Sequence, residues 1–378
     1  MQELAADGLY LGRVWRSDVE GPALVVLRNG RVVDITTRAA PTMASLLDNP
    51  DIVARVKGIS GEDLGPLAQL LVAQPVAGQT HLLAPCDLQA IKACGVTFAR
   101  SMVERVIEER AAGDPSRADA IRTRVVGVIG DSLRGLVPGS QKAAEVKAVL
   151  QAEGLWSQYL EVGIGPDAEV FTKAPPMAAV GFGAEVGLHP ISRWNNPEPE
   201  VVLAVDASGR IVGASLGNDV NLRDVEGRSA LLLGKAKDNN ASAAIGPFIR
   251  LFEGGFGLDE VRQAVVSLRV EGADGFVLEG RSSMAEISRD PADLVAQTRG
   301  RHHQYPDGFM LYCGTMFAPV QDRDGPGQGF THHIGDVVTV SSPGLGALRN
   351  VVRLATDCPE WSFGTGALMR NLAGRRLL

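Results

Sequence analysis

The pattern of polar and hydrophobic residues is most informative at residues 198–206, where two glutamates flank Pro199 and an apolar run follows at 201–205. Successive side chains of a β-strand point to opposite faces, so a period-two reading of this segment predicts a strand with two distinct faces. One face carries Glu198, Glu200, Val202 and Ala204, and the other carries Val201, Leu203 and Val205. Two carboxylates therefore point in the same direction at the start of the strand.

A turn and a second strand follow directly. Residues 206–209 read Asp-Ala-Ser-Gly, a turn signal, and residues 210–216 are strand-like. An antiparallel return would bring Asp219 to the end of the pair where Glu198 and Glu200 begin. We therefore expect three carboxylates to gather at one end of this hairpin.

Three neighbouring carboxylates cannot all ionise without a cation, because each negative charge opposes the ionisation of the next. No histidine or cysteine at ligand spacing accompanies them, and oxygen-only ligation favours Mg²⁺, with Mn²⁺ or Ca²⁺ as substitutes, over zinc. Spacing alone leaves an alternative open, namely a solvated acidic strand end followed by an Asn-Asp turn.

The sequence pattern of residues 1–85 predicts a small α+β domain. Hydrophobic runs flank Asn29-Gly30 within residues 22–36, which predicts a hairpin with a tight turn. Helices are expected near residues 41–48 and 62–74. Residues 86–378 then form a second domain, which carries the candidate chemistry.

The second domain begins with a predicted strand at residues 91–98 and a helix at 101–112. Met102, Val103, Val106 and Ile107 form an apolar stripe on this helix, and Ser101, Glu104, Arg105 and Glu108 are expected to face outward. The Ser101-x-x-Glu104 spacing also fits a capping box, which needs no catalytic role.

Residues 113–170 are expected to form an insertion. Its composition indicates a loop at 113–119, a strand at 125–130 and a helix at 142–152 that ends before Gly154. Together with the preceding helix, it forms an expected lid over residues 101–170. Further along the chain, residues 258–270 are expected to be an amphipathic helix.

Several motifs occur in a fixed order. They are Glu-x-Glu at 198–200, Asn-Asp-Val-x-x-Arg-Asp at 218–224, Gly-Pro at 246–247, a strand ending in Gly-Thr at 309–315, and a strand and turn at 335–350. This order resembles the fumarylacetoacetate hydrolase (FAH) superfamily over roughly residues 90–352, interrupted at the insertion. The resemblance implies an α+β fold with a mixed β roll, and Mg²⁺ on Glu198, Glu200 and Asp219.

The resemblance also implies roles for other residues. Lys237 matches a catalytic lysine, with Lys235 as the fallback, and an ammonium group suits a developing enolate. Gly314 and Thr315 are expected to contact a substrate carboxylate. Phe171-Thr-Lys173 resembles the approach to the metal strand.

The lid motif departs from that of the family's hydrolases, which carry His-x-x-Glu where this chain has Ser101-x-x-Glu104. Serine cannot replace histidine as a base that activates water at neutral pH. Hydrolysis is therefore in doubt, and the expected roles are proton transfer by Glu104 and substrate positioning by Ser101 and Lys235.

The predicted function is metal-dependent dehydration of a 2-keto-3-deoxy sugar acid to 2,5-dioxopentanoate through an enolate. This is the activity of the branch of the family that the sequence resembles most. The alternatives are hydrolysis of a carbon–carbon bond in a 2,4-dioxo acid and a non-catalytic sugar-acid binding protein.

The composition narrows the choice of partners. The chain has 378 residues, and its net charge of −7 argues against nucleic acids and anionic membranes. No basic and apolar leader or uncharged apolar run of about 18 residues occurs, and the four cysteines show no disulfide or metal spacing. A cytoplasmic enzyme with a small-molecule 2-oxo acid substrate is expected, and the resemblance implies a homo-oligomer.

Overall fold

The computed structural model describes residues 4–71, 75–76, 78–129, 136–152, 154 and 156–378. Within these residues, eleven strands form one large sheet and five form a second. The large sheet has the order β4 (Glu62–Pro66), β3 (Arg31–Asp34), β2 (Gly21–Arg28), β1 (Tyr10–Arg16), β11 (Ala243–Leu251), β10 (Ile211–Asp219), β9 (Pro199–Val205), β14 (Phe309–Tyr312), β6 (Ala90–Gly95) and β7 (Glu169–Ala174), and β5 (His81–Leu83) pairs with β1.

The second sheet has the order β13 (Val277–Ser283), β12 (Val265–Glu271), β15 (Val337–Ser342), β16 (Gly346–Leu354) and β8 (Glu185–Leu188). Both sheets are mixed, because β14 pairs in parallel with β6 and β16 in parallel with β8, whereas the other pairs are antiparallel. The predicted α+β class is confirmed.

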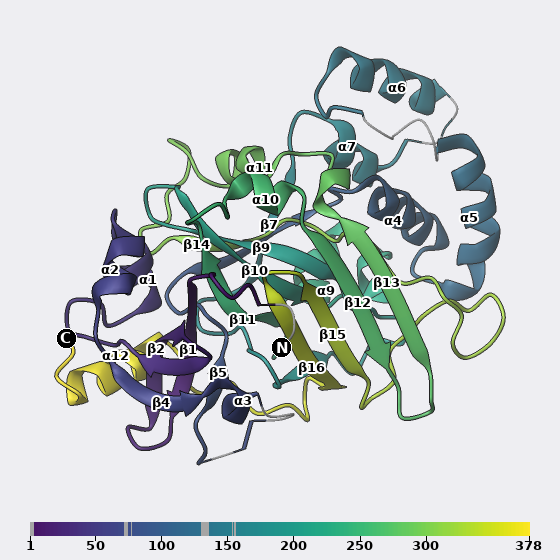
Figure 1. Ribbon diagram of the computed structural model, residues 1–378. Coiled ribbons are helices and arrows are strands. Elements are labelled where there is room, and N and C mark those ends of the chain that lie inside the picture. Colours follow the sequence, from purple (N-terminus) through teal and green to yellow (C-terminus); the bar gives the residue numbers. More distant parts are fainter. Residues whose placement is uncertain (1–3, 72–74, 77, 130–135, 153, 155) are drawn as a thin grey trace.

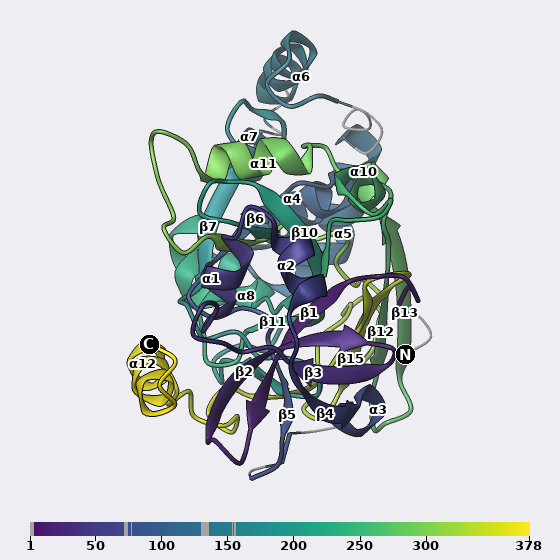
Figure 2. The ribbon, with the colours of Figure 1, turned by 60° about the vertical axis from the view of Figure 1, so that its left-hand side comes forward.

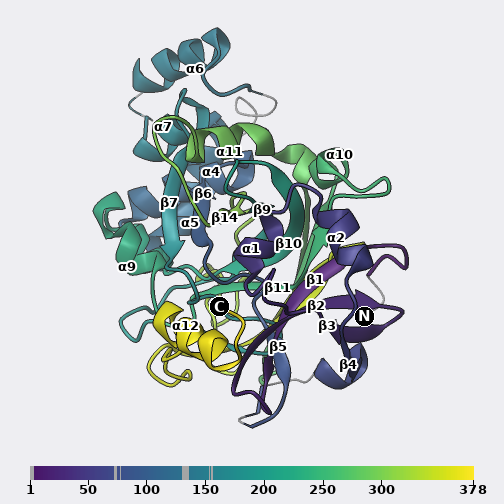
Figure 3. The same ribbon diagram turned by 90° about the vertical axis from the view of Figure 1, so that its left-hand side faces the viewer.

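The helices cover the edges and faces of these sheets. They are α1 (Met43–Leu47), α2 (Ile52–Gly58), α3 (Leu67–Leu70), α4 (Ala99–Ala111), α5 (Pro115–Ile129), α6 (Gln141–Ala152), α7 (Gln158–Ile164), α8 (Arg223–Glu226), α9 (Leu233–Lys237), α10 (Leu258–Arg262), α11 (Pro291–Thr298) and α12 (Thr365–Gly374), with short 3₁₀ turns at Ala230–Leu232 and Met284–Glu286. Figure 1 shows α4–α7 at one end of the molecule and the strands β1–β5 with α12 at the other, and Figures 2 and 3 show the same separation. None of the helices in the described ranges is long and apolar enough to cross a bilayer.

The two faces of β9 explain its pattern of side chains. Val201, Leu203 and Val205 belong to the core shared with the second sheet, whereas Val202 and Ala204 belong to a core covered by α1 and α2. Each face is buried against a different layer, so a shift of one residue would exchange the two sets. The predicted strand and its division into two faces are confirmed.

The N-terminal hairpin is also confirmed. β2 and β3 pair with Arg28 opposite Arg31, and the linking Asn29 and Gly30 both have positive φ, 50° and 73°. These angles suit the tight primed turn that Asn-Gly favours.

The N-terminal strands continue the large sheet rather than forming a sheet of their own. β1 pairs with β11 through Tyr10 opposite Arg250 and Leu11 opposite Ile249. Backbone hydrogen bonds therefore cross the expected boundary near residue 85, and the division into two domains stays a prediction.

Four predicted segments are wrong in whole or in part. Residues 62–74 hold β4 and the short α3, with 72–74 outside the described residues. The loop expected at 113–119 ends at residue 114, and α5, from Pro115 to Ile129, replaces the rest of it and the strand expected at 125–130, of which residue 130 lies outside the described residues. Proline suits the first position of a helix, where its missing N–H has no helical partner. Residues 258–270 hold α10 and then the start of β12, whose burial alternates with period two.

Candidate metal centre

Three carboxylates gather where β9 begins and β10 ends. Gly217 lies opposite Glu200 in the antiparallel pair, and the amide of Asp219 donates to the carbonyl of Glu198 at 3.0 Å. One oxygen each from Glu198, Glu200 and Asp219 lies within 4.8 Å of the others. All three residues are at most 1% exposed, so water cannot balance their charges.

Gly314 and Thr315 hold Glu200 in place. The Gly314 amide donates to Oε2 at 2.7 Å, and the Thr315 hydroxyl donates to Oε1 at 3.3 Å. Gly314 has φ of +105°, and a Cβ there would lie 1.9 Å from Oγ1 of Thr97, so this position requires glycine. Both residues thus contact a candidate ligand of the metal, and their expected contact with a substrate carboxylate stays a prediction.

Two buried lysines approach the cluster. Nζ of Lys237 lies 2.5 Å from Oε2 of Glu198 and 3.2 Å from Oδ2 of Asp219. Nζ of Lys173 lies 2.8 Å from Oδ1 of Asp219. Burial lowers the pKa of both ammonium groups, but the charges of Asp219 and Glu198 outweigh burial at Lys237 and raise its pKa.

The carboxylates divide into two classes. Burial raises the pKa of Glu198, but Lys237 and Arg105 more than offset it and lower that pKa to about 2. The pKa of Glu200 is raised well above its ordinary value by burial and by the charges of Asp219 and Glu198. The positive charges around the cluster are therefore too few to balance its acids. Its hard oxygen donors fit a divalent cation such as Mg²⁺.

The polar face of α4 is buried against this cluster, so its predicted outward orientation is wrong. Ser101, Arg105 and Glu108 are 3%, 7% and 1% exposed. The Arg105 guanidinium bonds to Glu198 and lies 2.6 Å from Glu108 and 2.8 Å from Glu226. These acids come from the residue before β9, from α4 and from α8, so Arg105 ties the lid helix to a candidate metal ligand.

Glu104 and Ser101 are engaged elsewhere. Arg122 donates to both oxygens of Glu104 at 3.0 and 2.9 Å, and Arg223 approaches it at 3.3 Å. The Ser101 hydroxyl donates to the Phe98 carbonyl at 2.9 Å, and Phe98 is the N-cap of α4, so Ser101-x-x-Glu104 does not form a capping box.

Lys235 is exposed, and of the two lysines in α9 only Lys237 reaches the carboxylates. The structure thus brings together Glu198, Glu200, Asp219, Lys237, Gly314 and Thr315, and it places Glu104 and Lys235 in other surroundings.

Sequence reasoning missed one acid, Glu169, the first residue of β7. Its carboxylate lies over Gly95, where a Cβ would be 1.9 Å from Oε2. Burial, then Glu226 and Glu198, raise its pKa to about 7, while Arg105 and Lys237 oppose them. Period two places Glu169 on the same face as Phe171 and Lys173, a signal that could have revealed it.

The sheet arrangement and this centre define a protein of the fumarylacetoacetate hydrolase class. The family described as "Fumarylacetoacetate (FAA) hydrolase C-terminal" matches residues 140–353, more than half of the chain. The chain belongs to this family.

Two curated relatives are dehydratases. A probable 2-keto-3-deoxyxylonate dehydratase of Haloferax volcanii is 27% identical over 256 residues, which cover 68% of this chain and 84% of the relative. A 2-dehydro-3-deoxy-D-arabinonate dehydratase of Saccharolobus solfataricus is 27% identical over 188 residues, 49% of this chain and 58% of the relative.

Solved structures share the fold. A 2-keto-3-deoxy-D-arabinonate dehydratase complexed with magnesium and 2,5-dioxopentanoate has a TM-score of 0.62 and 19% identity, with 91% of this chain and 99% of that chain covered. A fumarylacetoacetate hydrolase from Exiguobacterium antarcticum has a TM-score of 0.55 and 16% identity, with 92% and 99% covered. Dehydratases and hydrolases thus have this fold in common.

Proposed function

We propose that this protein is a Mg²⁺-dependent dehydratase that converts a 2-keto-3-deoxy pentonate to 2,5-dioxopentanoate. The observation that carries the proposal is the buried triad of Glu198, Glu200 and Asp219, in which Lys237 contacts Glu198 and Asp219. The chain that holds this triad is related to two sugar-acid dehydratases. The same triad would hold the metal.

Bound at the triad, Mg²⁺ would polarise the 2-keto group of the substrate and so acidify the protons on C3. Lys237 would add a fixed positive charge beside the developing enolate, in surroundings where water does not screen it. Lys173 holds Asp219 from the other side and touches the Lys237 carbonyl, so it would position both groups.

Glu169 is our candidate for proton transfer, because burial and then the charges of Glu226 and Glu198 raise its pKa to about 7. A carboxyl group with a pKa of about 7 can both accept and donate a proton near neutral pH. Glu169 would take a proton from C3 and return it to the C4 hydroxyl, which leaves as water. A proton shift from C5 to C3 and tautomerisation then give the aldehyde at C5. Glu104, held by Arg122 and Arg223, would position the lid, and the proton transfer expected of it stays a prediction.

Hydrolysis of a 2,4-dioxo acid receives less support. The hydroxyl of Ser101, which occupies the place of the hydrolases' histidine, donates to a carbonyl of its own helix. A homo-oligomer and a cytoplasmic location stay predictions, the second supported by four buried free thiols.

A product assay tests the proposal. The protein with Mg²⁺ is incubated with 2-keto-3-deoxy-D-arabinonate, 2-keto-3-deoxy-D-xylonate and an acylpyruvate, with and without EDTA. We expect EDTA-sensitive formation of 2,5-dioxopentanoate from a pentonate. Lys237→Met is expected to abolish turnover, and the matched control Lys235→Met to retain it. Pyruvate release from the acylpyruvate, or full activity after metal removal, would refute the dehydratase.

A further inference from the structure

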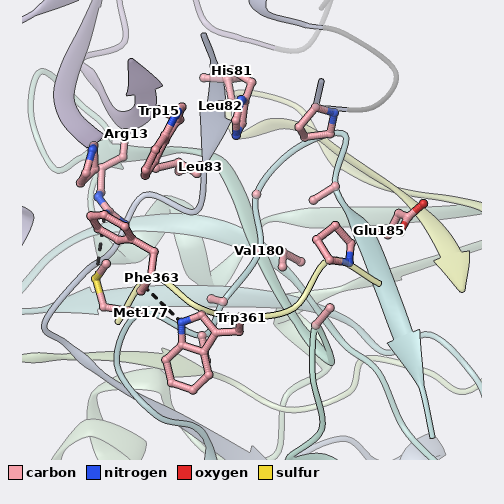
Figure 4. A pocket seen from close by; sticks show the side chains of 18 of the residues that line it. Arg13, Trp15, His81, Leu82, Leu83, Met177, Val180, Glu185, Trp361 and Phe363 are labelled. Carbon is pink, nitrogen blue, oxygen red and sulfur yellow. Dashed lines mark hydrogen bonds between the residues drawn. The ribbon is translucent and has the colours of Figure 1, made fainter. Parts of the chain in front are cut away.

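A second cavity, separate from the metal centre, lies between the N-terminal strands and the C-terminal tail. Its volume is about 350 Å³, within the range of small-molecule sites. Figure 4 shows Trp15, Phe363 and Met177 on one side and His81–Leu83 and Val180 around the rest. No carboxylate of the triad and neither Lys173 nor Lys237 lines it.

Aromatic side chains form a preassembled apolar wall. Trp15 and Phe363 meet edge to face, with ring centroids 5.1 Å apart. The Trp361 indole N–H donates to the Phe363 carbonyl at 3.2 Å, so its polar edge is used within the tail. Trp361 is nevertheless 45% exposed, a large apolar surface at the mouth of the cavity.

A buried cation lines the same cavity. Arg13 is 4% exposed, and its Nη1 donates to the carbonyls of Ala84, at 3.3 Å, and Cys86. Its Nη2 is approached by the Met177 thioether at 4.0 Å, and its Nε has no hydrogen-bond partner among the described residues. Asp87, whose oxygens accept from three backbone amides, is 3.8 Å from Nε, too far for a hydrogen bond.

The Nε–Nη2 edge of a guanidinium is one that carboxylates bind with two parallel hydrogen bonds. In Arg13, the Met177 sulfur approaches Nη2 and the Asp87 carboxylate lies beyond hydrogen-bond distance of Nε, so this edge has no hydrogen-bonded oxygens from the described residues. Met177 is a flexible residue that lines the cavity, so its thioether can rotate away from Nη2. Buried donors are rarely left unfilled, and an oxygen-bearing ligand would account for this one.

We propose that this cavity is a second ligand site, for a small carboxylic acid with an aromatic body. The carboxylate binds the Nε–Nη2 edge of Arg13, and the ring packs against Trp15, Trp361 and Phe363. The site binds without the metal centre, so its occupancy can be tested whether or not the dehydratase proposal holds.

The test compares 3-phenylpropionate with 3-phenyl-1-propanol, which has the same ring and chain but no charge, by calorimetric titration of the full chain. We expect the acid to bind about tenfold more tightly than the alcohol. Arg13→Gln should remove this difference. Trp361→Ala, at an exposed position that folding tolerates, should weaken both probes about fivefold.

Two variants control for other sites. Val277→Ala removes an exposed apolar side chain elsewhere and should change neither affinity. Glu198→Gln alters the metal centre and should also leave binding intact. Equal affinity for acid and alcohol, loss of binding in Glu198→Gln, or no binding at millimolar concentrations would overturn the proposal. So would a Trp361→Ala protein that changes its oligomeric state while probe binding stays the same, because this face would then be a subunit interface.

Discussion

Two of the buried ionic clusters in the described part of the chain differ in charge balance. In the first, Asp336 is 1% exposed and accepts from Arg323 at 2.6 and 2.8 Å, from His332 at 3.1 Å and from the His333 amide at 3.0 Å. Burial raises the pKa of Asp336, but the hydrogen bonds from Arg323 and His332 outweigh it and lower that pKa. Its own partners are thus enough to keep Asp336 ionised, and in this sense the cluster is complete.

The candidate metal centre is the second cluster, and its acids are not balanced. Its three carboxylates are as deeply buried, and the pKa of Glu200 is raised by burial and then by the charges of Asp219 and Glu198, which Lys237 and the Gly314 amide do not offset. Burial alone therefore does not distinguish a structural ion cluster from a candidate metal site. The distinguishing feature is a deficit of positive charge that the surrounding lysines and arginine do not remove.

The largest expected effect is on activity at the incomplete cluster. Glu198→Gln keeps the shape of the side chain but removes a charge that the cation needs, and we expect kcat to fall about 1000-fold or more. The unfolding temperature without metal should fall as well, because the buried Lys237 and Arg105 each lose a charged partner. Measured kcat and thermal unfolding together test this expectation, and a variant with normal turnover would contradict the metal assignment.

At the complete cluster, we expect an effect on stability alone. Asp336→Asn leaves Arg323 buried with one charge fewer beside it, which should cost about 3 kcal/mol of unfolding free energy. Turnover of the folded protein should be unchanged. Asp274→Asn removes a half-exposed partner of the same arginine and is the matched control, with an expected cost below about 1 kcal/mol. Denaturant titrations would measure both.

Acid provides a related check. Because the folded-state pKa of Asp336 is below its ordinary value, its contribution to stability is present above about pH 4 and is lost as the pH falls further. In Asp336→Asn, the unfolding free energy should therefore fall less steeply as the pH drops below 4. Equal acid sensitivity in both proteins would argue against this cluster as its source.

A third, smaller effect concerns Glu169. If Glu169 removes the C3 proton, kcat/KM should rise with pH and level off above its pKa of about 7. Glu169→Gln should lower kcat about 100-fold and remove this limb. Glu161→Gln, in the exposed pair with Lys147, serves as the control. A limb that persists in Glu169→Gln would assign the proton transfer to another group.

The smallest effect is on thermal stability. Mg²⁺ at about ten times its Kd should stabilise the folded protein by about 1.4 kcal/mol and raise its unfolding temperature by about 2 °C. Glu200→Gln should lose this shift, while Asp336→Asn should keep it. Potassium chloride at equal ionic strength controls for screening.

The strand pair that carries the acids could be predicted from the sequence for a physical reason. The two faces of β9 are buried in two different cores. The division of its side chains between the faces, the turn that follows it and its register with β10 therefore all depend on residues within this segment. The tight turn at Asn29-Gly30 is similarly local. Such features need no knowledge of distant segments.

The polar face of α4 could not be predicted in this way. Arg105 and Glu108 read as solvated because their partners, Glu226 and Arg223, come more than a hundred residues later. The β-branched residues at 125–129 read as a strand, but in the fold they continue α5, which runs alongside α4. Local β-propensity therefore did not decide the secondary structure of this segment.

The pairing of β1 with β11 has a practical consequence for anyone dividing this chain for expression. A fragment starting near residue 86 would uncover the end of β11 that pairs with β1, at Ile249 and Arg250, on the strand next to the acid-bearing hairpin. Bare strand sides recruit other chains, so such a fragment should precipitate or stack rather than behave as a self-sufficient catalytic unit.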